Sequence, residues 1–281
     1  MTKRRNIFYR SWAAVRFVVL WLWIILNVPI AAINPGGKLG VWQFRVLMGI
    51  ICFLAGFRYK ISGQLSKKRP LLLVGNHIAS IEFGVLPAAL GINFFGKAEI
   101  AKMPLIGFFS RKMGVQFIDR NPRRAKEMIK KIKEFTERAS YPMVIFPEGT
   151  TTNGSYVHPF KSALFNILEP QLNGDADAAH FTVQPFVMHF RDGRGNVLTD
   201  DDLAENYASF DNAKQLQGRN DVRMRGEFEQ VFHVMKLGGM TVEIELLPPP
   251  PLAGITDRHA VAEMLHKIIS DKYMETKDRK R

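Results

Sequence analysis

A histidine and a glutamate lie five residues apart behind a short apolar run, within residues 75–82 (GNHIASIE). A carboxylate that holds one ring nitrogen of an imidazole sets its tautomer and leaves the other nitrogen free to act as a general base. On a regular helix this spacing would separate His77 and Glu82 by about 140° around the axis. The two can therefore meet only if a turn intervenes and the helix begins near Ser80. The alternative is a helix cap followed by a surface glutamate, and the spacing alone leaves both open.

A second polar segment follows another apolar run, at residues 146–154 (FPEGTTTNG). Backbone amides freed by Gly149, together with the hydroxyls of three successive threonines, are able to bind an oxyanion or a polar headgroup. The alternative is an ordinary glycine turn with a threonine or asparagine cap.

A third segment, residues 114–120 (GVQFIDR), closes on an arginine. The guanidinium of Arg120 has the fork geometry that suits a phosphate, although a salt bridge to Asp119 explains it equally well. Other familiar chemistry is absent from the sequence: there is no His-Glu-x-x-His, no P-loop and no Gly-x-Ser-x-Gly. The single cysteine, Cys52, excludes an internal disulfide and any multi-cysteine metal site. We therefore predict no metal site.

The elements that must position these segments read as alternating strands and helices, which is typical of an α/β domain. Short apolar runs predict four buried strands: Pro70–Gly75, Met143–Pro147, Thr182–Phe190 and Met240–Leu247. Helical periodicity predicts helices at Arg123–Ala139 and His259–Tyr273. The polar stretch Asp200–Arg225 reads as an insertion or long loop, and Lys277–Arg281 as a solvated tail.

The N-terminal region is unusually apolar. Phe17–Ile33 carries no charge, Leu39–Phe57 carries only Arg45, and a turn signal (NPGG, 34–37) lies between them. Each stretch is marginal for spanning a bilayer, and basic residues flank both outer ends, which places both ends on the cytoplasmic side. The pattern favours a membrane helical hairpin over a cleaved signal peptide or a pair of buried core helices.

The net charge of the chain limits the classes of partner that we expect it to bind. The 281 residues carry a formal net charge of +13, and 47% are hydrophobic, so a sizeable core can form and global disorder is excluded. A balance this basic favours polyanionic surroundings, either nucleic acid, acidic lipid or a phosphorylated substrate. Because the basic residues are not interleaved with exposed aromatics and nucleic-acid binding leaves the apolar N-terminus unexplained, we expect a membrane surface and no nucleic acid as partner.

The three polar segments, in this order, resemble the glycerolipid acyltransferase family that includes 1-acylglycerol-3-phosphate acyltransferase. That family carries Asn-His-x4-Asp, a Gly-x-x-Phe-Ile-Asp-Arg block, Phe-Pro-Glu-Gly-Thr-Arg-Ser and a Val/Ile-x-Pro strand. Here these stand as Asn76-His77 with Glu82, residues 114–120, residues 146–150, and Val183-Gln184-Pro185. The resemblance covers residues 58–190 and implies an α/β fold with an acyltransferase-type mixed sheet flanked by helices.

Two departures from the family pattern bear on the substrate. Glu82 replaces the usual aspartate, and Thr151 and Thr152 replace the Arg-Ser after Glu-Gly-Thr. The missing arginine weakens lysophosphatidic acid as the acceptor and looks more like members acting on other lysophospholipids or on lyso-ornithine lipid, whereas Arg120 favours a phosphate. We predict O-acyl transfer to a lysophospholipid, with 1-acylglycerol-3-phosphate as the first acceptor and lyso-ornithine lipid as the alternative. A basic binding protein without catalysis is the alternative of another class.

The resemblance also implies a set of site residues and partners. His77 and Glu82 are the expected catalytic pair. The expected substrate-binding residues are Asn76, Lys97, Lys102, Arg120, Glu148, Gly149, Thr150 and Thr151. No cofactor is expected, with acyl-coenzyme A or acyl carrier protein supplying the acyl group to a membrane lipid.

These expectations define three regions. Residues 1–57 form a membrane-associated hairpin, 58–275 the acyltransferase domain and 276–281 a basic tail. The active site is expected on the cytoplasmic face of a membrane, that of a bacterial inner membrane.

Overall fold

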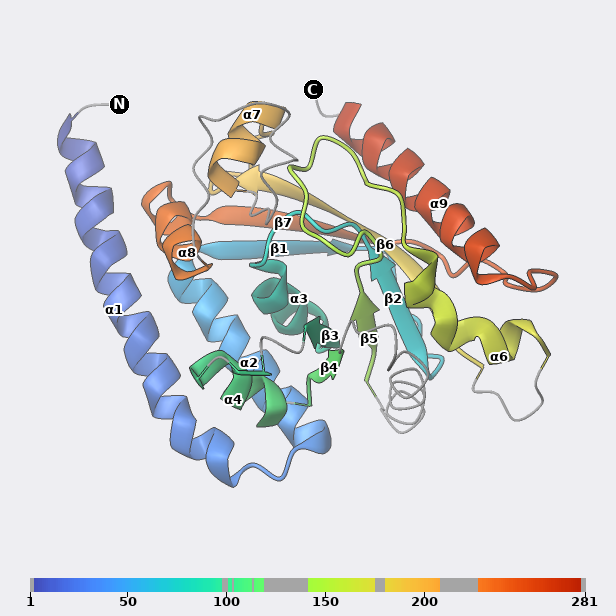
Figure 1. Ribbon diagram of the computed structural model, residues 1–281. Helices are drawn as coiled ribbons and strands as arrows, with labels where there is room; N and C mark the ends of the chain where they lie inside the picture. The colour runs from blue at the N-terminus through green and yellow to red at the C-terminus, as the bar shows by residue number, and fades with distance from the viewer. Residues whose placement is uncertain are drawn as a thin grey trace.

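The computed structural model describes residues 3–97, 101–102, 104–112, 114–118, 141–174, 180–207 and 227–278. Within these ranges seven strands form one sheet in the order β1-β7-β6-β2-β5-β3-β4 (Figure 1). The strands are β1 (Phe57–Ser62), β2 (Leu71–Gly75), β3 (Asn93–Lys97), β4 (Gln116–Ile118), β5 (Met143–Ile145), β6 (Thr182–Asp192) and β7 (Met240–Leu246). Only β6 and β7 pair antiparallel, so the sheet is mixed, as predicted.

The four predicted strands are confirmed as β2, β5, β6 and β7, with ends shifted by one or two residues. Each lies inside the sheet with most of its residues buried, and burial on both faces is what produces an apolar run. The sequence analysis missed β1, β3 and β4. Strand β1 is an edge strand with only Phe57 buried, so it carries no apolar run, and its place depends on parallel pairing with β7.

The N-terminal hairpin has the predicted form. Helix α1 (Lys3–Ile33) and helix α2 (Gly37–Ala55) are joined by the predicted turn. Gly36 and Gly37 adopt φ of 87° and 60°, a region that favours glycine. The Asn34 side chain accepts from Gly36 N at 2.7 Å and donates to the Gln43 side chain, which closes the turn.

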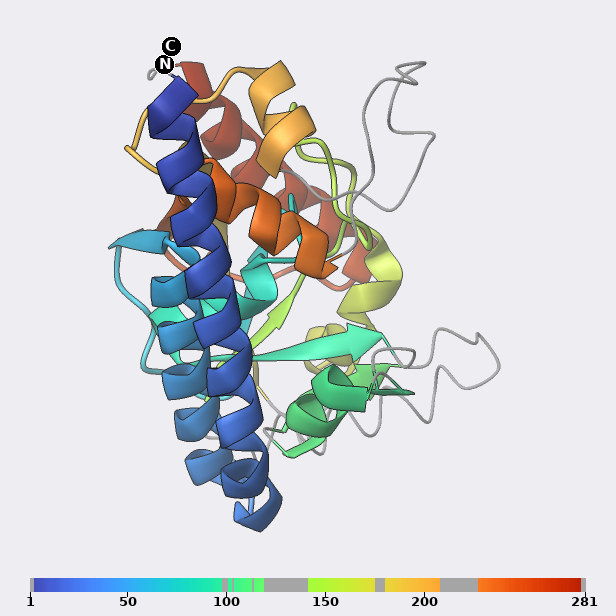
Figure 2. The same cartoon turned by 90° about the vertical axis from the view of Figure 1, so that its left-hand side faces the viewer.

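The hairpin packs against the sheet domain on one side. Arg45 of α2 donates to the carbonyls of Ala88 and Ala89 at the end of α3 (Glu82–Leu90). Helix α1 lies beside α2 and meets α8 (Glu227–Lys236) through the ring pair Phe17–Phe232, 4.9 Å between centroids (Figure 2). Both α1 and α2 are long and apolar enough to cross a membrane by length and composition.

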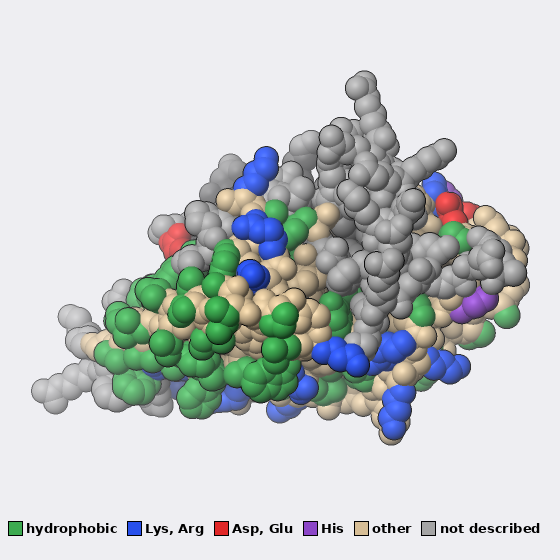
Figure 3. Space-filling view, turned by 90° about the horizontal axis from the view of Figure 1, so that it is seen from below, with side chains coloured by type: hydrophobic (Ala, Val, Ile, Leu, Met, Phe, Trp, Pro, Cys, Tyr) green, Lys and Arg blue, Asp and Glu red, His purple; other side chains and the backbone are tan. Residues whose placement is uncertain are grey.

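The other side of the hairpin is an exposed apolar surface. Apolar side chains gather over this end of the molecule, with lysines and arginines beside them (Figure 3). Its large members are Trp12, Val15, Val18, Val19, Leu22, Ile25, Leu26, Ile30, Ile33, Leu39, Trp42, Val46 and Phe53. We call these residues the hairpin surface.

The remaining helices correct two predictions. The predicted closing helix is confirmed as α9 (Arg258–Asp278), which runs past the expected start of the tail, so residues 276–278 are helical. Residues 200–207, predicted as loop, form α7 (Asp200–Asp202) and a π turn (Leu203–Tyr207). The predicted helix Arg123–Ala139 lies outside the described residues. Helix α4 (Pro104–Lys112), a 3-10 helix (Ser162–Leu168) and α6 (Glu169–Leu172) complete the described helices.

Candidate active site

His77 and Glu82 meet at the carboxyl end of β2. The strand ends at Gly75, and α3 begins at Glu82 after a turn at Ser80 and Ile81. This turn brings His77 Nδ1 within 2.6 Å of Glu82 Oε2. The required intervening turn is present, although the helix begins two residues later than expected. Both residues are buried, with Glu82 at 0% and His77 at 8% exposure.

The Glu82 carboxylate also closes the loop that carries the histidine. Its Oε1 accepts from Ile78 N at 2.7 Å and from Ala79 N at 2.9 Å. A carboxylate only accepts hydrogen bonds, so Nδ1 of His77 carries the proton and Nε2 keeps its lone pair. This is the tautomer that a general base needs.

Aromatic side chains fix the plane of the imidazole. Phe146, just after β5, stacks on His77 with 4.2 Å between centroids and 9° between planes. Phe83 of α3 presents its edge at 5.8 Å. With Glu82 on one nitrogen and rings on two sides, the imidazole is held in one orientation.

The segment after β5 holds the backbone of His77. Glu148 Oε1 accepts from His77 N at 2.7 Å, and Glu148 Oε2 accepts from His158 N at 2.8 Å. Thr152 donates to His77 O from both its backbone N, at 2.9 Å, and its hydroxyl, at 3.1 Å. The two segments that the sequence analysis selected separately therefore form one hydrogen-bonded unit.

Asn76 anchors this unit to the sheet. Its Nδ2 donates to Met188 O at 3.1 Å, and its Oδ1 accepts from Met188 N at 2.8 Å. Asn76 and Glu148 were both predicted to bind substrate. Their described hydrogen bonds instead go to the backbone, which makes them residues that position His77, and substrate contact stays a prediction.

Of the other predicted binding residues, three lie in the turn after β5 and the rest lie elsewhere or outside the described residues. Gly149 adopts φ of +71° at the turn, Thr150 donates to the Thr151 carbonyl, and Thr151 is buried with no hydrogen-bond partner for its hydroxyl. Lys102 is exposed in a short turn. Lys97 ends β3, but its side chain is not described, and Arg120 lies outside the described residues.

The C-terminal helix contributes a contact that sequence reasoning missed. Tyr273 of α9 donates to Gly154 O at 2.5 Å, and Lys277 donates to Ser155 O at 2.7 Å. Lys277 also pairs with Asp200 at 2.8 Å. The prediction of a solvated tail is therefore wrong for Lys277, whose side chain is bound to neighbouring segments. No local signal marks these residues, because their partners lie more than a hundred positions away along the chain.

Burial of Glu148 gives a testable pH dependence. Burial, opposed by its two backbone hydrogen bonds and reinforced by Glu82, raises the pKa of Glu148 from 4.5 to about 8. The folded state then binds more protons than the unfolded state between these values, so the free energy of unfolding should fall as pH rises from about 5 to 8. The contribution is at most about 1.4 kcal/mol per pH unit.

Thermal unfolding of the wild type and of Glu148→Gln across this pH range is the measurement. The free energy of unfolding of the variant should depend less on pH, because its amide does not titrate whereas Glu148 is protonated at pH 5 and ionised above its pKa of about 8. An equal pH dependence in both proteins would contradict the assignment to Glu148.

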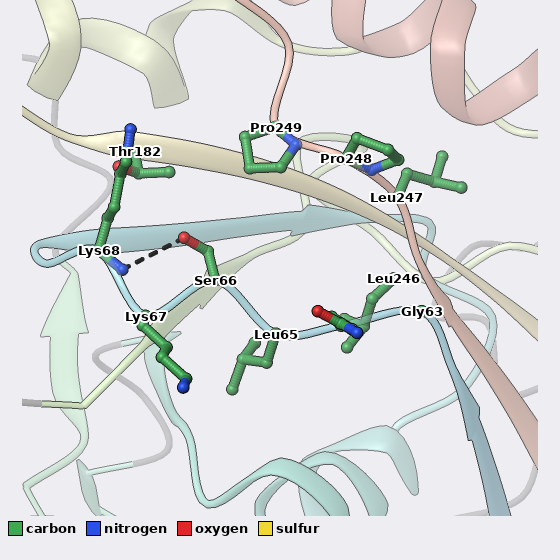
Figure 4. A pocket seen from close by; sticks show the side chains of 11 residues that line it. Gly63, Leu65, Ser66, Lys67, Lys68, Thr182, Leu246, Leu247, Pro248 and Pro249 are labelled. Carbon is green, nitrogen blue, oxygen red and sulfur yellow. Dashed lines mark hydrogen bonds between the residues drawn. The ribbon is translucent and has the colours of Figure 1, made fainter.

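A cavity of about 750 Å³ opens at the opposite edge of the sheet (Figure 4). It lies where β1 and β7 end and β6 begins, whereas His77 follows the end of β2, which runs parallel to β6. Its lining consists of residues 63–68, Thr182 and residues 246–249. None of the predicted site residues lines it.

Comparison with known proteins decides the family. A sequence model of the family described as Acyltransferase matches residues 57–189, which include all four motifs. Lyso-ornithine lipid O-acyltransferase of Brucella abortus (strain 2308) is 30% identical over 221 residues, covering 77% of this chain and 76% of that protein. This chain belongs to the acyltransferase family. The predicted resemblance and enzyme class are confirmed.

Two further likenesses extend over nearly the whole acyltransferase chain. Lyso-ornithine lipid O-acyltransferase of Pseudomonas aeruginosa is 26% identical over 274 residues, covering 95% of this chain and 93% of that protein. The crystal structure of the 1-acyl-sn-glycerophosphate (LPA) acyltransferase PlsC from Thermotoga maritima matches with a TM-score of 0.59 at 15% identity, covering 99% and 98% of the two chains. The structural match shows a shared fold.

Proposed function

We propose that this acyltransferase moves a fatty acyl group from an acyl thioester to the free hydroxyl of a lysolipid, with His77 as general base. The observation that carries the proposal is the 2.6 Å contact between His77 Nδ1 and Glu82 Oε2 at the end of β2. It leaves Nε2 as the proton acceptor.

The reaction needs no covalent enzyme intermediate. His77 Nε2 takes the proton from the acceptor hydroxyl as its oxygen attacks the thioester carbonyl. The tetrahedral oxyanion then collapses, the carbon–sulfur bond breaks, and the leaving thiolate takes the proton from the imidazolium. Glu82 stabilises the imidazolium between these steps. We propose that a backbone N–H of the 146–152 turn stabilises the oxyanion, a contribution worth about 3–4 kcal/mol for a good donor.

We propose lyso-ornithine lipid as the acceptor, with acyl-coenzyme A or acyl carrier protein as the donor. Two relatives with this description match three quarters or more of the chain. Thr151 is neutral at the position after Glu-Gly-Thr, where the family pattern carries an arginine, and this difference supports an acceptor other than lysophosphatidic acid. Lysophosphatidic acid, the acceptor first predicted from the sequence, is the second candidate, and Arg120 favours it.

We further propose that the hairpin surface lies in the membrane, with the site on its cytoplasmic face. The exposed apolar side chains of α1 and α2 support immersion, and basic residues flank both outer ends of the hairpin. The acceptor and product are both lipids, so a site held at the interface avoids extracting them. Flotation of the full chain with anionic liposomes tests this, and protein left at the bottom of the gradient would contradict it.

A panel of lipid acceptors tests the reaction itself. The full chain, purified in detergent, is incubated with acyl-coenzyme A or acyl carrier protein and lyso-ornithine lipid, lysophosphatidic acid or lysophosphatidylethanolamine. Mass spectrometry should show acylation of lyso-ornithine lipid with the highest kcat/KM. Acylation of lysophosphatidic acid alone would favour the second candidate, and no acylation of any acceptor would overturn the proposed function.

A further inference from the structure

Lys161 occupies an unusual place beside the candidate active site. Its backbone N donates to Pro147 O at 2.9 Å, which folds residues 158–161 back onto the turn at Glu148 and Gly149. Its side chain lies against the bare α-carbon of Gly149: a Cβ built there would come within 2.6 Å of Lys161 Nζ and 3.0 Å of Cδ. The glycine therefore provides the space in which the lysine stem lies, as well as the positive φ of the turn.

The ammonium of Lys161 is exposed to solvent and has no partner among the residues that the structure describes. Within the described ranges, the ammonium makes no ion pair and no hydrogen bond, although the residue is exposed to solvent. The nearest carboxylate along the turn, Glu148, already accepts from two backbone N–H groups. Lys161 is also the only lysine or arginine between residues 141 and 174. A positioned cation with no internal partner is suited to an anion from outside the protein.

The location of Lys161 indicates which anion it would bind. Phe146 and Glu148, which precede Gly149, contact the ring and the backbone of His77. The acceptor hydroxyl must reach His77, and the carboxylate of an ornithine headgroup or the phosphate of a glycerophosphate lies a few covalent bonds from that hydroxyl. The phosphates of coenzyme A are separated from the thioester by the whole pantetheine arm. A cation on the turn that touches His77 therefore matches the acceptor.

We propose that Lys161 binds the anionic group of the acceptor headgroup and so positions its hydroxyl at His77. The proposal rests on the proposed function, because it takes the acceptor to be a lysolipid whose headgroup carries a carboxylate or a phosphate. Lys161 supplies the cation for this turn, in which Thr151 is neutral and buried.

Equilibrium binding without an acyl donor tests Lys161 independently of turnover. Radiolabelled lyso-ornithine lipid and its methyl ester, in which the carboxylate is neutralised, are bound to the full chain in detergent micelles. Lys161→Met should raise Kd for the acid by about tenfold or more, because it removes the cation that pairs with the carboxylate, and should not raise Kd for the ester, which has no carboxylate. Lys161→Arg should keep most of the preference for the acid.

Controls and a second ligand pair identify the source of the anion. Lys267→Met removes an exposed lysine on α9 that pairs with Asp271 and should leave both Kd values unchanged. Lysophosphatidic acid compared with monoacylglycerol repeats the test for phosphate, and the pair that responds names the headgroup.

Three outcomes would overturn the proposal: no preference of the wild type for the ligand that carries the anionic group in either pair, equal weakening of both ligands of a pair by Lys161→Met, or a fall in kcat alone with Kd unchanged. Failure of the proposed function can be told apart from failure of this proposal. In that case the wild type would still bind the charged ligand in a Lys161-dependent way, but the acceptor panel would show no acyl transfer.

Discussion

Replacing His77 with alanine is expected to lower kcat for acyl transfer by about 10²–10⁴-fold, the usual contribution of a positioned general base. The variant loses the Nε2 lone pair that takes the proton from the acceptor hydroxyl. It keeps the contacts of Glu148 and Thr152, because these go to the backbone of residue 77. Initial rates with a radiolabelled acyl thioester and lyso-ornithine lipid measure the effect.

The fold of this variant is checked by its melting temperature. His259→Ala, at an exposed position on α9, is the matched control and should keep the wild-type rate. Turnover by His77→Ala at the wild-type rate would show that another group removes the proton, and the contact with Glu82 would then have only a structural purpose.

Replacing Glu82 with glutamine should be nearly as damaging to kcat, although one atom changes. The amide oxygen of glutamine can still accept from Ile78 N and Ala79 N. Its NH₂ group then faces His77 Nδ1, which must accept, so the proton moves to Nε2 and blocks the base. The analogous acid-to-amide change in a Ser-His-Asp triad costs about 10⁴-fold, and we expect a fall of about 10²–10⁴-fold here.

The glutamine variant separates tautomer control from folding. Glu82→Ala also leaves the N–H groups of Ile78 and Ala79 without their acceptor and should lower the melting temperature. Glu82→Gln should melt close to the wild type. The control is Glu263→Gln, at an exposed position on α9. A Glu82→Gln variant with wild-type kcat would show that this carboxylate does not set the working tautomer.

The outcome for individual elements shows where sequence reasoning succeeds. Strands β2 and β6 lie inside the sheet and are buried on both faces. Because both faces must then be apolar, each strand appears in the sequence as a continuous apolar run. The helical hairpin could also be predicted from the sequence, because a long charge-free stretch and an Asn-Pro-Gly-Gly turn are local features. Strand β1 is half polar and is stabilised by its register with β7, a partner far along the chain.

In the candidate site, too, local features could be predicted from the sequence and long-range contacts could not. The sequence by itself determined which residue types follow the strands: the histidine and glutamate of the first motif, the Glu-Gly-Thr turn of the second, and the four motifs that mark an acyltransferase. Those are local patterns, carried by adjacent residues. Only the tertiary structure decided that Glu148 and Thr152 grip the backbone of His77, that Lys161 lies on Gly149, and that α9 holds the loop at Gly154. These contacts join positions that are distant along the chain, and they form only when the folded chain brings those positions together, so no local pattern specifies them.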